Sequence, residues 1–319
     1  MKQHLYIITG PTASGKTDVA LYIARQLDNA EIISADSMQV YRKMDIGTAK
    51  VPVNIRKMIP HHLIDIVDPW ESYNMGKYVK DARNIVSKMN KDKRILIVGG
   101  TGLYIRGITK GVFKGPAADW EFRDQLQSVA NEKGSAYLHN LLNKVDPVSA
   151  ARLHPKDHKR VIRAIEVYEK TGTTISRLQK LYLTQEPDFE YSIFVINRPK
   201  EDLYKRIDSR IEDMFEHGLV NEVIALRENP NGLSRQAQQA LGYKETLQYL
   251  DNKMDIQDTK DMIKRNTKKF AKRQMTWFRS FSNTFWINST SEHNCETVGD
   301  EILRIIEKQQ CCHGQLNYL

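Results

Sequence analysis

The sequence has no long apolar run. None of its apolar stretches approaches the roughly 20 residues that a helix needs to cross a bilayer. A charged leader followed by an apolar stretch is also missing at the beginning, because residues 1–4 run directly into the short apolar stretch 5–9. We therefore expect neither membrane insertion nor secretion, and we expect a location in the cytoplasm.

Cysteine is scarce. Three cysteines, Cys295, Cys311 and Cys312, cannot form a disulfide framework in a chain of 319 residues, which favours a reducing compartment. Together with His313 they could be imagined as metal ligands, but adjacent cysteines lack the paired spacing of a zinc site. We expect no metal to bind there.

Acidic residues are outnumbered by basic ones. The chain has 48 Lys and Arg against 39 Asp and Glu, which gives a net charge of +9 and a pI near 9.2. Such a balance favours a polyanionic partner without identifying it. With 40% hydrophobic and 27% charged residues the composition is that of a folded protein, and the length predicts about two domains.

The pattern of short apolar stretches predicts an α/β fold with a parallel sheet flanked by helices. Strands are expected at residues 5–9, 31–35, 94–98, 191–197 and 284–287. Helices are expected at residues 16–27, 119–133, 159–170 and 201–228. No convincing buried strand occurs in residues 115–190, so we expect a helical insertion domain there, between the two parts of the core, residues 1–114 and 191–319.

A phosphate-binding loop follows the first predicted strand. Residues 10–17 read GPTASGKT and fit the pattern G-x-x-x-x-G-K-[ST] between a strand and a helix. Backbone N–H groups and the helix N-terminus attract phosphate oxygens, Lys16 adds a positive charge, and Thr17 can offer its hydroxyl to Mg²⁺. The residues expected to bind a diphosphate or a nucleotide are Gly10, Pro11, Thr12, Ala13, Ser14, Gly15, Lys16 and Thr17.

The acidic residue that helps a P-loop NTPase to hold magnesium is missing from its usual place. The best candidate strand, residues 95–98, ends in Gly99-Gly100-Thr101-Gly102, which offers backbone amides and a hydroxyl where a carboxylate would be expected. This loop resembles a second anion-binding cradle. Its composition argues against nucleotide hydrolysis and leaves open a diphosphate ligand that is displaced whole.

Asp36 is the nearest carboxylate at a strand end. It follows the predicted strand 31–35, and ligands of parallel sheets gather at the carboxyl ends of the strands, so it should face the P-loop. A carboxylate there can accept a proton from a nucleophile or hold a metal-bound water, whereas the plain alternative is an aspartate that stabilises a turn. We prefer the role of a general base.

Residues 36–42, taken with the P-loop, resemble the tRNA dimethylallyltransferases, also called tRNA isopentenyltransferases. Further blocks that resemble the family follow in the family's order: DIGTAK at residues 45–50, PHHLID at 60–65, GGTGLY at 99–104 and KRQMTWFR at 272–279. Together they span nearly the whole chain. The resemblance implies a fold similar to that of P-loop NTPases, with a helical insertion that contacts tRNA.

The resemblance also implies an activity. A dimethylallyl group would pass from dimethylallyl diphosphate to N6 of the adenine 3′ of the anticodon, position 37, with Mg²⁺ and release of diphosphate. Lys16 would stabilise the leaving group and Asp36 would take a proton from the amine, and by resemblance Thr101 and Arg123 also lie near the reacting centre. The partner would be the anticodon stem-loop of tRNA, and the enzyme would be a monomer.

A basic segment near the C-terminus provides a candidate RNA surface. Within residues 260–279, cations recur at helical spacing at Lys264, Arg265, Lys268, Lys269, Lys272 and Arg273. Phe270, Trp277 and Phe278 add aromatic surface that could stack on loop bases, although a merely solvated basic face is the competing interpretation.

Residues predicted to contact tRNA come from four blocks. They are Asp36, Ser37, Met38, Gln39, Lys159, Arg160, Val161, Ile162, Arg163, Gly242, Tyr243, Lys244, Lys272, Arg273, Gln274, Trp277 and Arg279. Ser37, Met38 and Gln39 would line the pocket of an adenine that leaves its stack. The family often has Gln where Lys159 stands here.

Two other functions use the same features. A small-molecule or nucleoside kinase would share the P-loop, the magnesium and a strand-end aspartate, but it needs neither the 99–102 cradle nor the basic segments. A nucleotide-gated RNA-binding protein without catalysis would bind tRNA equally well after Asp36→Asn. The transferase is the reading that uses all of these features.

Overall fold

The computed structural model describes residues 2–113, 115–182 and 189–315, and the side chains of these except at residues 182 and 310–315. The hypothesis about Cys311, Cys312 and His313 therefore concerns side chains outside the described ones. The chain divides into two compact units, Met1–Thr109 with Asp188–Leu319, and Lys110–Pro187. We call them the sheet unit and the helical unit.

The sheet unit is built on a sheet of six strands in the order β3-β2-β4-β1-β5-β6, and every pair is parallel. The strands are β1 (Gln3–Thr9), β2 (Ala30–Ser34), β3 (His61–His62), β4 (Arg94–Gly99), β5 (Phe189–Asn197) and β6 (Thr284–Asn288). The predicted parallel α/β sheet is confirmed. The two-residue strand β3 was not expected, because it is too short to show a pattern.

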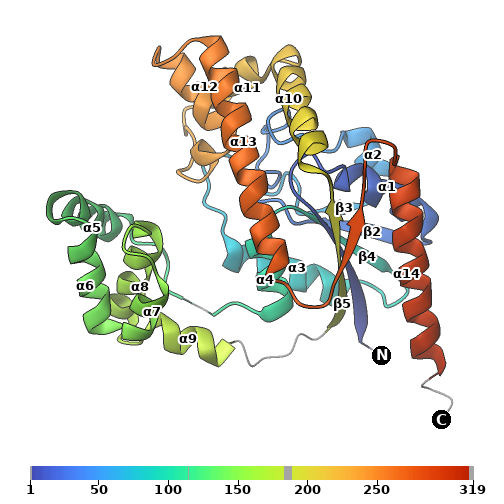
Figure 1. Ribbon diagram of the computed structural model, residues 1–319, viewed down its shortest axis with the longest axis horizontal. Helices are drawn as coiled ribbons and strands as arrows, with labels where there is room; N and C mark the ends of the chain where they lie inside the picture. Colours follow the sequence, from blue (N-terminus) through green and yellow to red (C-terminus); the bar gives the residue numbers. More distant parts are fainter. Residues whose placement is uncertain (1, 114, 183–188, 316–319) are drawn as a thin grey trace. The chain divides into compact units, whose positions relative to one another are not determined.

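Helices cover both faces of this sheet (Figure 1). Those of the sheet unit are α1 (Lys16–Gln26), α2 (Val53–Met58), α3 (Met75–Lys88), α4 (Gly102–Lys110), α10 (Lys200–Glu216), α11 (Leu219–Arg227), the 3₁₀ helix η1 (Ala237–Gln239), α12 (Tyr243–Leu250), α13 (Ile256–Arg279) and α14 (Cys295–Gln315). Ile7 and Ile8 point to opposite faces of β1 and both are fully buried, because helices lie on either side. This explains why the strands read as continuous apolar runs.

Each face has its own core. On one face α1 and α14 pack against the sheet, with Ile23 and Ile302 in the same apolar cluster as Ile8. On the other, Tyr78 of α3 stacks on Tyr104 of α4 with ring centroids 4.0 Å apart. These cores hold the carboxyl ends of the strands in place.

The helix predicted for residues 201–228 is divided. Helix α10 ends at Glu216 and α11 begins at Leu219, with Gly218 at φ 94° between them. A positive φ cannot continue a right-handed helix and suits glycine best. The division turns α11 away from α10.

The helical unit contains α5 (Trp120–Lys133), α6 (Ser135–Val145), α7 (Pro147–Arg152), α8 (His158–Thr171) and α9 (Ile175–Tyr182), and its described residues form no strand. The side chains of Asp119, Asp146 and Asp157 accept hydrogen bonds from backbone N–H groups at the starts of α5, α7 and α8. Leu138, Leu142 and Val161 are fully buried in its core. The unit therefore has a core of its own.

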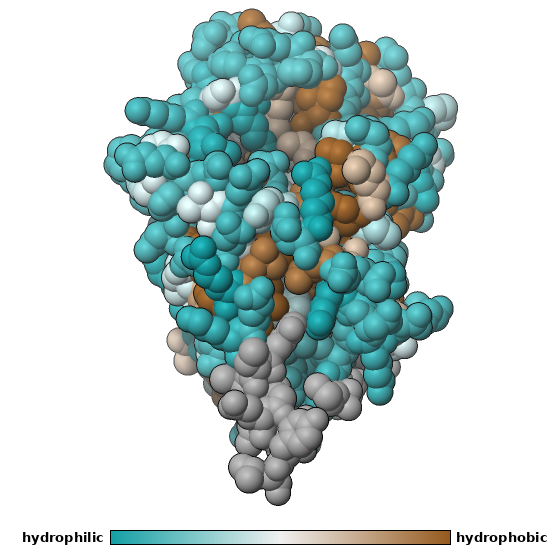
Figure 2. All heavy atoms as spheres, turned by 90° about the vertical axis from the view of Figure 1, so that its right-hand side faces the viewer, coloured by the Kyte–Doolittle hydropathy of each residue, from teal (hydrophilic) through white to brown (hydrophobic). Residues whose placement is uncertain are grey.

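The surface is mostly polar on the side of the molecule that Figure 2 shows, with hydrophobic residues gathered near the middle and the right of that view. Among the helices in the described part of the chain, none combines the length and the apolar character needed to cross a membrane.

Candidate active site

The P-loop joins β1 to α1 as predicted. Gly10 has no room for a side chain, since a Cβ would lie 2.9 Å from the carbonyl oxygen of Ile196 in the neighbouring strand β5. Gly15 adopts φ 88° at the start of α1, which is a left-handed conformation that favours glycine. These two glycines explain why the loop can turn its amides toward one point. The hydroxyl of Ser14 is buried there without a hydrogen-bond partner among the described residues.

Three arginines that sequence reasoning missed donate hydrogen bonds to this loop. The Nε–H groups of Arg198 and Arg206 donate to the carbonyl oxygens of Ser14 and Ala13, both at 2.9 Å. Arg210 donates from Nη1 to the hydroxyl of Thr12 at 3.3 Å. Because β5 pairs with β1, the chain that follows β5 begins beside the P-loop. The arginines at positions 198, 206 and 210 are spaced by multiples of four residues, and that spacing was the available signal.

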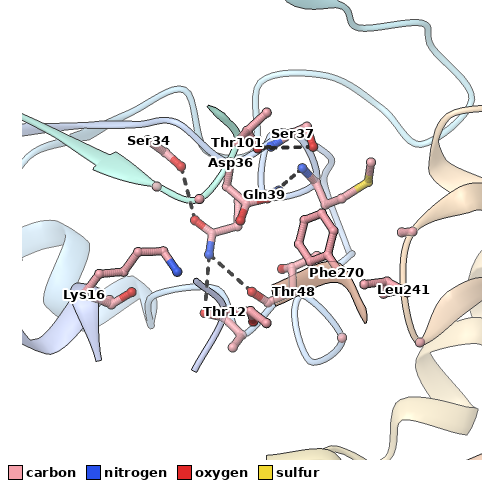
Figure 3. A pocket seen from close by; sticks show the side chains of 18 of the residues that line it. Thr12, Lys16, Ser34, Asp36, Ser37, Gln39, Thr48, Thr101, Leu241 and Phe270 are labelled. Atoms are coloured by element: carbon pink, nitrogen blue, oxygen red, sulfur yellow. Dashed lines mark hydrogen bonds between the residues drawn. The ribbon is translucent and has the colours of Figure 1, made fainter. Parts of the chain in front are cut away.

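A cavity of about 370 Å³ opens at the carboxyl ends of the strands, entirely within the sheet unit. Figure 3 shows Lys16 and Thr12 of the P-loop region, Asp36 and Gln39 after β2, and Phe270 of α13 around it. One part of the cavity suits an anion, because two cations, Lys16 and Arg210, and the hydroxyl of Thr17 line it. Apolar side chains form its other walls. These apolar residues include Met38, Ile207, Ile211, Met214, Leu241 and Phe270. The cavity suits a ligand that carries phosphates and an apolar group together.

The position of Asp36 allows one carboxylate oxygen to stabilise a turn and the other to act as a general base. Its Oδ1 accepts hydrogen bonds from the backbone N–H groups of Met38 at 2.8 Å and Gln39 at 3.3 Å. No described residue donates a hydrogen bond to its Oδ2. Asp36 lines the cavity and is close enough to Lys16 and Arg210 to raise the pKa of both cations. One oxygen thus fixes the turn while the other remains free for chemistry.

The loop after β4 lies directly beside Asp36. Gly99 has no space for a Cβ, which would overlap the carbonyl group of Ala35. The N–H of Thr101 donates to that carbonyl oxygen at 3.1 Å, and the Thr101 hydroxyl accepts from the N–H of Ser37 at 3.1 Å. The predicted neighbourhood of Asp36, Ser37 and Thr101 is therefore present in the structure, and all three residues line the cavity.

The charge of Lys16 is set by its surroundings. Burial in the cavity wall lowers the pKa of its ammonium group from 10.5 to about 8, Asp36 raises that pKa and Arg210 lowers it. Burial likewise lowers the pKa of Arg210, against the opposing effect of Asp36. Two cations with little water and one nearby carboxylate form a site that favours an added anion.

We expect the affinity for inorganic diphosphate to fall as pH rises through about 8. In the ligand-free protein Lys16 loses its proton in this range, whereas the complex with diphosphate needs Lys16 to be protonated. Between pH 7 and pH 9 the loss should be about tenfold. The pKa of Lys16 is lower in the folded protein than in the unfolded chain, so the unfolded chain binds more protons in this range. Lys16 therefore makes the fold more stable as pH rises. Calorimetric titration across this range tests the affinity change. Lys16→Arg is the control, because its guanidinium stays protonated across this range and its affinity should therefore stay constant. Equal pH profiles of the variant and wild type would contradict the assignment.

A carboxylate of α11 organises the DIGTAK block. Glu222 accepts hydrogen bonds from the backbone N–H groups of Asp45, Ile46 and Gly47 at 2.9, 2.7 and 3.2 Å, and from the hydroxyl of Tyr243 at 2.5 Å. Gly47 is required because a Cβ would overlap the Tyr243 ring. The same loop also accepts a hydrogen bond from the side chain of Gln39, whose Nε2 donates to the carbonyl oxygen of Thr48 at 3.2 Å. Glu222 thereby supports one wall of the cavity.

Replacing Glu222 with alanine is expected to lower the free energy of unfolding by about 2 kcal/mol, since three backbone donors lose a charged acceptor. Urea denaturation measures the change. Glu228→Ala, at an exposed position just after α11, is the matched control and should change stability by less than about 0.5 kcal/mol. Equal stability of the two variants would show that the three N–H groups do not depend on the carboxylate.

The cationic stripe on α13 differs from the prediction. Lys264 and Lys268 face α10, where they form ion pairs with Glu212 and Asp208 at 2.5 and 2.7 Å. Phe278 is fully buried and cannot stack on a base. The exposed cations lie on a different face of the helix, and they are Arg265, Lys269, Lys272, Arg273 and Arg279. A candidate phosphate track is therefore narrower than the sequence suggested.

The other predicted RNA residues fall into two groups. Val161 and Ile162 are buried in the core of the helical unit, whereas Tyr243 is buried but lines the cavity of the sheet unit. Gly242 starts α12 at φ 88°, a conformation that favours glycine. Lys159, Arg160 and Lys244 are exposed and remain candidates for contact with a polyanion.

Arg123 lies in the helical unit and does not line the cavity described above. Its Nε and Nη2 donate to Oε1 and Oε2 of Glu166 at 2.9 and 2.7 Å, a two-point contact with a fully buried carboxylate. Arg163 contacts the same carboxylate and also donates to the carbonyl oxygen of Pro116 at 3.0 Å. In this structure Arg123 joins α5 to α8, and Arg163 joins α8 to the segment before α5. The catalytic role of Arg123 stays a prediction.

The fold and the cavity define an α/β protein of the P-loop class whose phosphate site faces a strand-end aspartate. A family model described as IPP transferase matches residues 39–281, and one described as isopentenyl transferase matches residues 3–57. The chain belongs to the IPP transferase family. Its relatives include tRNA dimethylallyltransferases of Alkaliphilus oremlandii, 44% identical over 95% of this chain and 97% of the relative, and of Carboxydothermus hydrogenoformans, 43% identical over the same shares.

Solved structures agree with this assignment. The chain is similar to the full-length tRNA isopentenylpyrophosphate transferase from Bacillus halodurans, with a TM-score of 0.72 and 35% identity over 100% of both chains. It is also similar to a eukaryotic dimethylallyltransferase acting on tRNA, with a TM-score of 0.78 and 26% identity over 98% of this chain and 80% of that one. The expected family is therefore confirmed.

Proposed function

We propose that this protein transfers a dimethylallyl group from dimethylallyl diphosphate to N6 of the adenine at position 37 of tRNA, and releases diphosphate. The observation that carries this proposal is one cavity that contains the P-loop cations, the Asp36 carboxylate and an apolar wall. Each feature matches one part of the reaction: the diphosphate, the attacking amine and the prenyl group. Relatives named tRNA dimethylallyltransferase over nearly their full length support the same conclusion.

The leaving group presents the main chemical demand. Breaking an allylic C–O bond places negative charge on the departing diphosphate, and groups that bind this charge lower the barrier. Lys16, Arg210 and the amides of the P-loop supply positive charge and N–H donors at the same end of the cavity. Their low hydration means that little solvent must be rearranged as charge develops.

The acceptor amine must lose a proton as its new C–N bond forms. The N6 amine of adenine is a poor nucleophile because its lone pair is delocalised into the ring, so a positioned proton acceptor matters. Asp36 Oδ2 is the candidate, since Oδ1 is held by the turn. The Thr101 hydroxyl, which accepts from the N–H of Ser37, fixes the neighbouring backbone and lies in the same cavity.

Magnesium fits the site as an ion shared with the substrate. The described residues contain no cluster of three His, Cys, Asp or Glu side chains that could hold a metal without a ligand. Thr17 lines the cavity and offers a hard oxygen atom of the kind that Mg²⁺ prefers, and phosphate oxygens would complete its coordination. When bound there, the ion would neutralise part of the diphosphate charge.

We further propose that the exposed cations of α13 and α8 contact the anticodon stem-loop. Lys272, Arg273, Lys159 and Arg160 are exposed, and the net charge of +9 favours an RNA partner. Trp277 is partly exposed, and an aromatic ring at such a position suits stacking on an unpaired base. The proposal also includes that the protein acts as a monomer and that it acts on tRNA in the cytoplasm.

A kinase remains the alternative that an assay must separate, although family membership argues against it. Purified protein is incubated with Mg²⁺, labelled dimethylallyl diphosphate and unmodified tRNA that has adenine at position 37, and the label bound to RNA is counted. Transfer that depends on adenine 37 is the expected result. No transfer, together with ATP consumption on a small acceptor, would replace the proposal by the kinase.

A further inference from the structure

Gln274 of α13 connects the two loops of the cavity. Its Oε1 accepts a hydrogen bond from the backbone N–H of Thr12 at 2.9 Å, and its Nε2 donates to the carbonyl oxygen of Gly100 at 2.9 Å. The side chain lies between the P-loop, residues 10–17, and the loop after β4. It is only 5% exposed, so its amide is not available to RNA in this structure. Gln274 also lines the cavity, and its predicted contact with tRNA stays a prediction.

We propose that Gln274 is a positioning residue that fixes the P-loop and the Gly99–Gly102 loop relative to each other, so that the donor diphosphate can bind. This inference rests on the proposed function. The P-loop supplies groups for the diphosphate, and the second loop packs against Ala35 and Ser37 on either side of Asp36. One amide thus sets the distance between the leaving-group site and the base.

The fit around this amide is close on both sides. A Cβ on Gly100 would overlap Nε2 of Gln274, so glycine at this position makes room for the bridge. One turn further along α13, a Cβ on Gly102 would lie 2.9 Å from Cβ of Trp277. The helix is therefore seated against the whole glycine-rich loop, which explains why this loop is built from glycines where a carboxylate would otherwise be expected.

Thr12 is fixed on both of its polar groups. Its N–H is used by Gln274, and its hydroxyl accepts from Arg210. A P-loop amide that points at a protein carbonyl is not available to a phosphate, so the phosphates must be bound by amides further along the loop. Without Gln274, the Thr12 N–H and the carbonyl of the buried Gly100 would lose these hydrogen bonds, and we expect the two loops to separate and admit water.

The test compares donor and acceptor binding in Gln274→Met, which keeps the length of the side chain and removes both hydrogen bonds. We expect the Kd for inorganic diphosphate with Mg²⁺ to rise about tenfold and kcat to fall by a similar factor. The Kd for tRNA should stay within about twofold of wild type. Thr276→Ala, an exposed position on the same helix, is the control and should match wild type in all three measurements.

A second variant tests the contact itself. Gly100→Ala should displace the Gln274 amide and weaken diphosphate binding by a similar factor, whereas in a Gln274→Ala background the same change should cost little. Additive effects of the two substitutions would overturn the proposal. So would a Gln274→Met protein that binds diphosphate like wild type but loses tRNA. Diphosphate binding is measured without prenyl transfer, so a failure of this inference is distinct from a failure of the proposed function.

Discussion

Asp36→Asn is expected to lower the rate of prenyl transfer by about 10²–10⁴, the usual contribution of a general base. The loss should be chemical and not structural. An asparagine Oδ1 can still accept the hydrogen bonds from the N–H groups of Met38 and Gln39, so the turn is preserved. An amide in place of Oδ2, however, cannot take a proton from the adenine amine.

Single-turnover assays with saturating tRNA and donor measure this effect without the contribution of binding. Asp18→Asn makes the same chemical change at an exposed position in the first turn of α1 and should leave the rate unaltered. The Kd for tRNA should also be unaltered by Asp36→Asn. A variant that keeps more than about a tenth of the wild-type rate would remove Asp36 from the role of base.

Arg210→Met is expected to reduce kcat by about 10²–10³, the cost of removing one group that stabilises a developing anion. The same substitution should not lower the melting temperature. The guanidinium is buried in the cavity wall, burial lowers its pKa, and no described carboxylate lies within ion-pair distance of it. Removing such a charge relieves desolvation that the folded protein otherwise bears.

Measuring kcat and the melting temperature together shows whether Arg210 acts in catalysis or stabilises the fold. Arg25→Met, at an exposed site in the last turn of α1, is the matched control and should change neither activity nor melting temperature. Excess inorganic diphosphate should raise the melting temperature of wild type more than that of Arg210→Met, since a ligand stabilises the state that binds it. A clearly lowered melting temperature for Arg210→Met would instead assign the arginine to the fold.

The motifs were predictable because each is contiguous and sits at a strand end. The P-loop, Asp36 and Gly99–Gly102 follow β1, β2 and β4, which are neighbours in the sheet, so the shared edge brings them together. Recognising three strands was enough to place them. The residue types at those ends then indicated the chemistry.

The arginines of α10 could not be placed in the same way. Arg206 and Arg210 contact the P-loop only because β5 lies next to β1, and sequence periodicity does not report which strands pair. A helical wheel of α13 shows a cationic face, but it does not show that Glu212 and Asp208 of α10 neutralise part of it.

Burial of some members of the family blocks could not be predicted for a related reason. Tyr243 lies in a block that resembles a tRNA-contacting segment, yet its ring packs over Gly47 and its hydroxyl donates to Glu222. Ile162 likewise belongs to the core of the helical unit. A contiguous block on a helix includes every face of that helix, and only residues that are exposed or line the cavity can meet a partner.

The strand order has a consequence for synthesis on the ribosome. β1 is made first, but it pairs Leu5 with Ile95 on one side and with Tyr191 on the other. A nascent chain that stops short of β5 contains the complete GPTASGKT motif, and still has an unpaired edge on its central strand and none of the arginines that brace the loop. Competence to bind the donor therefore arrives late in translation, and truncated products carry the motif without the activity.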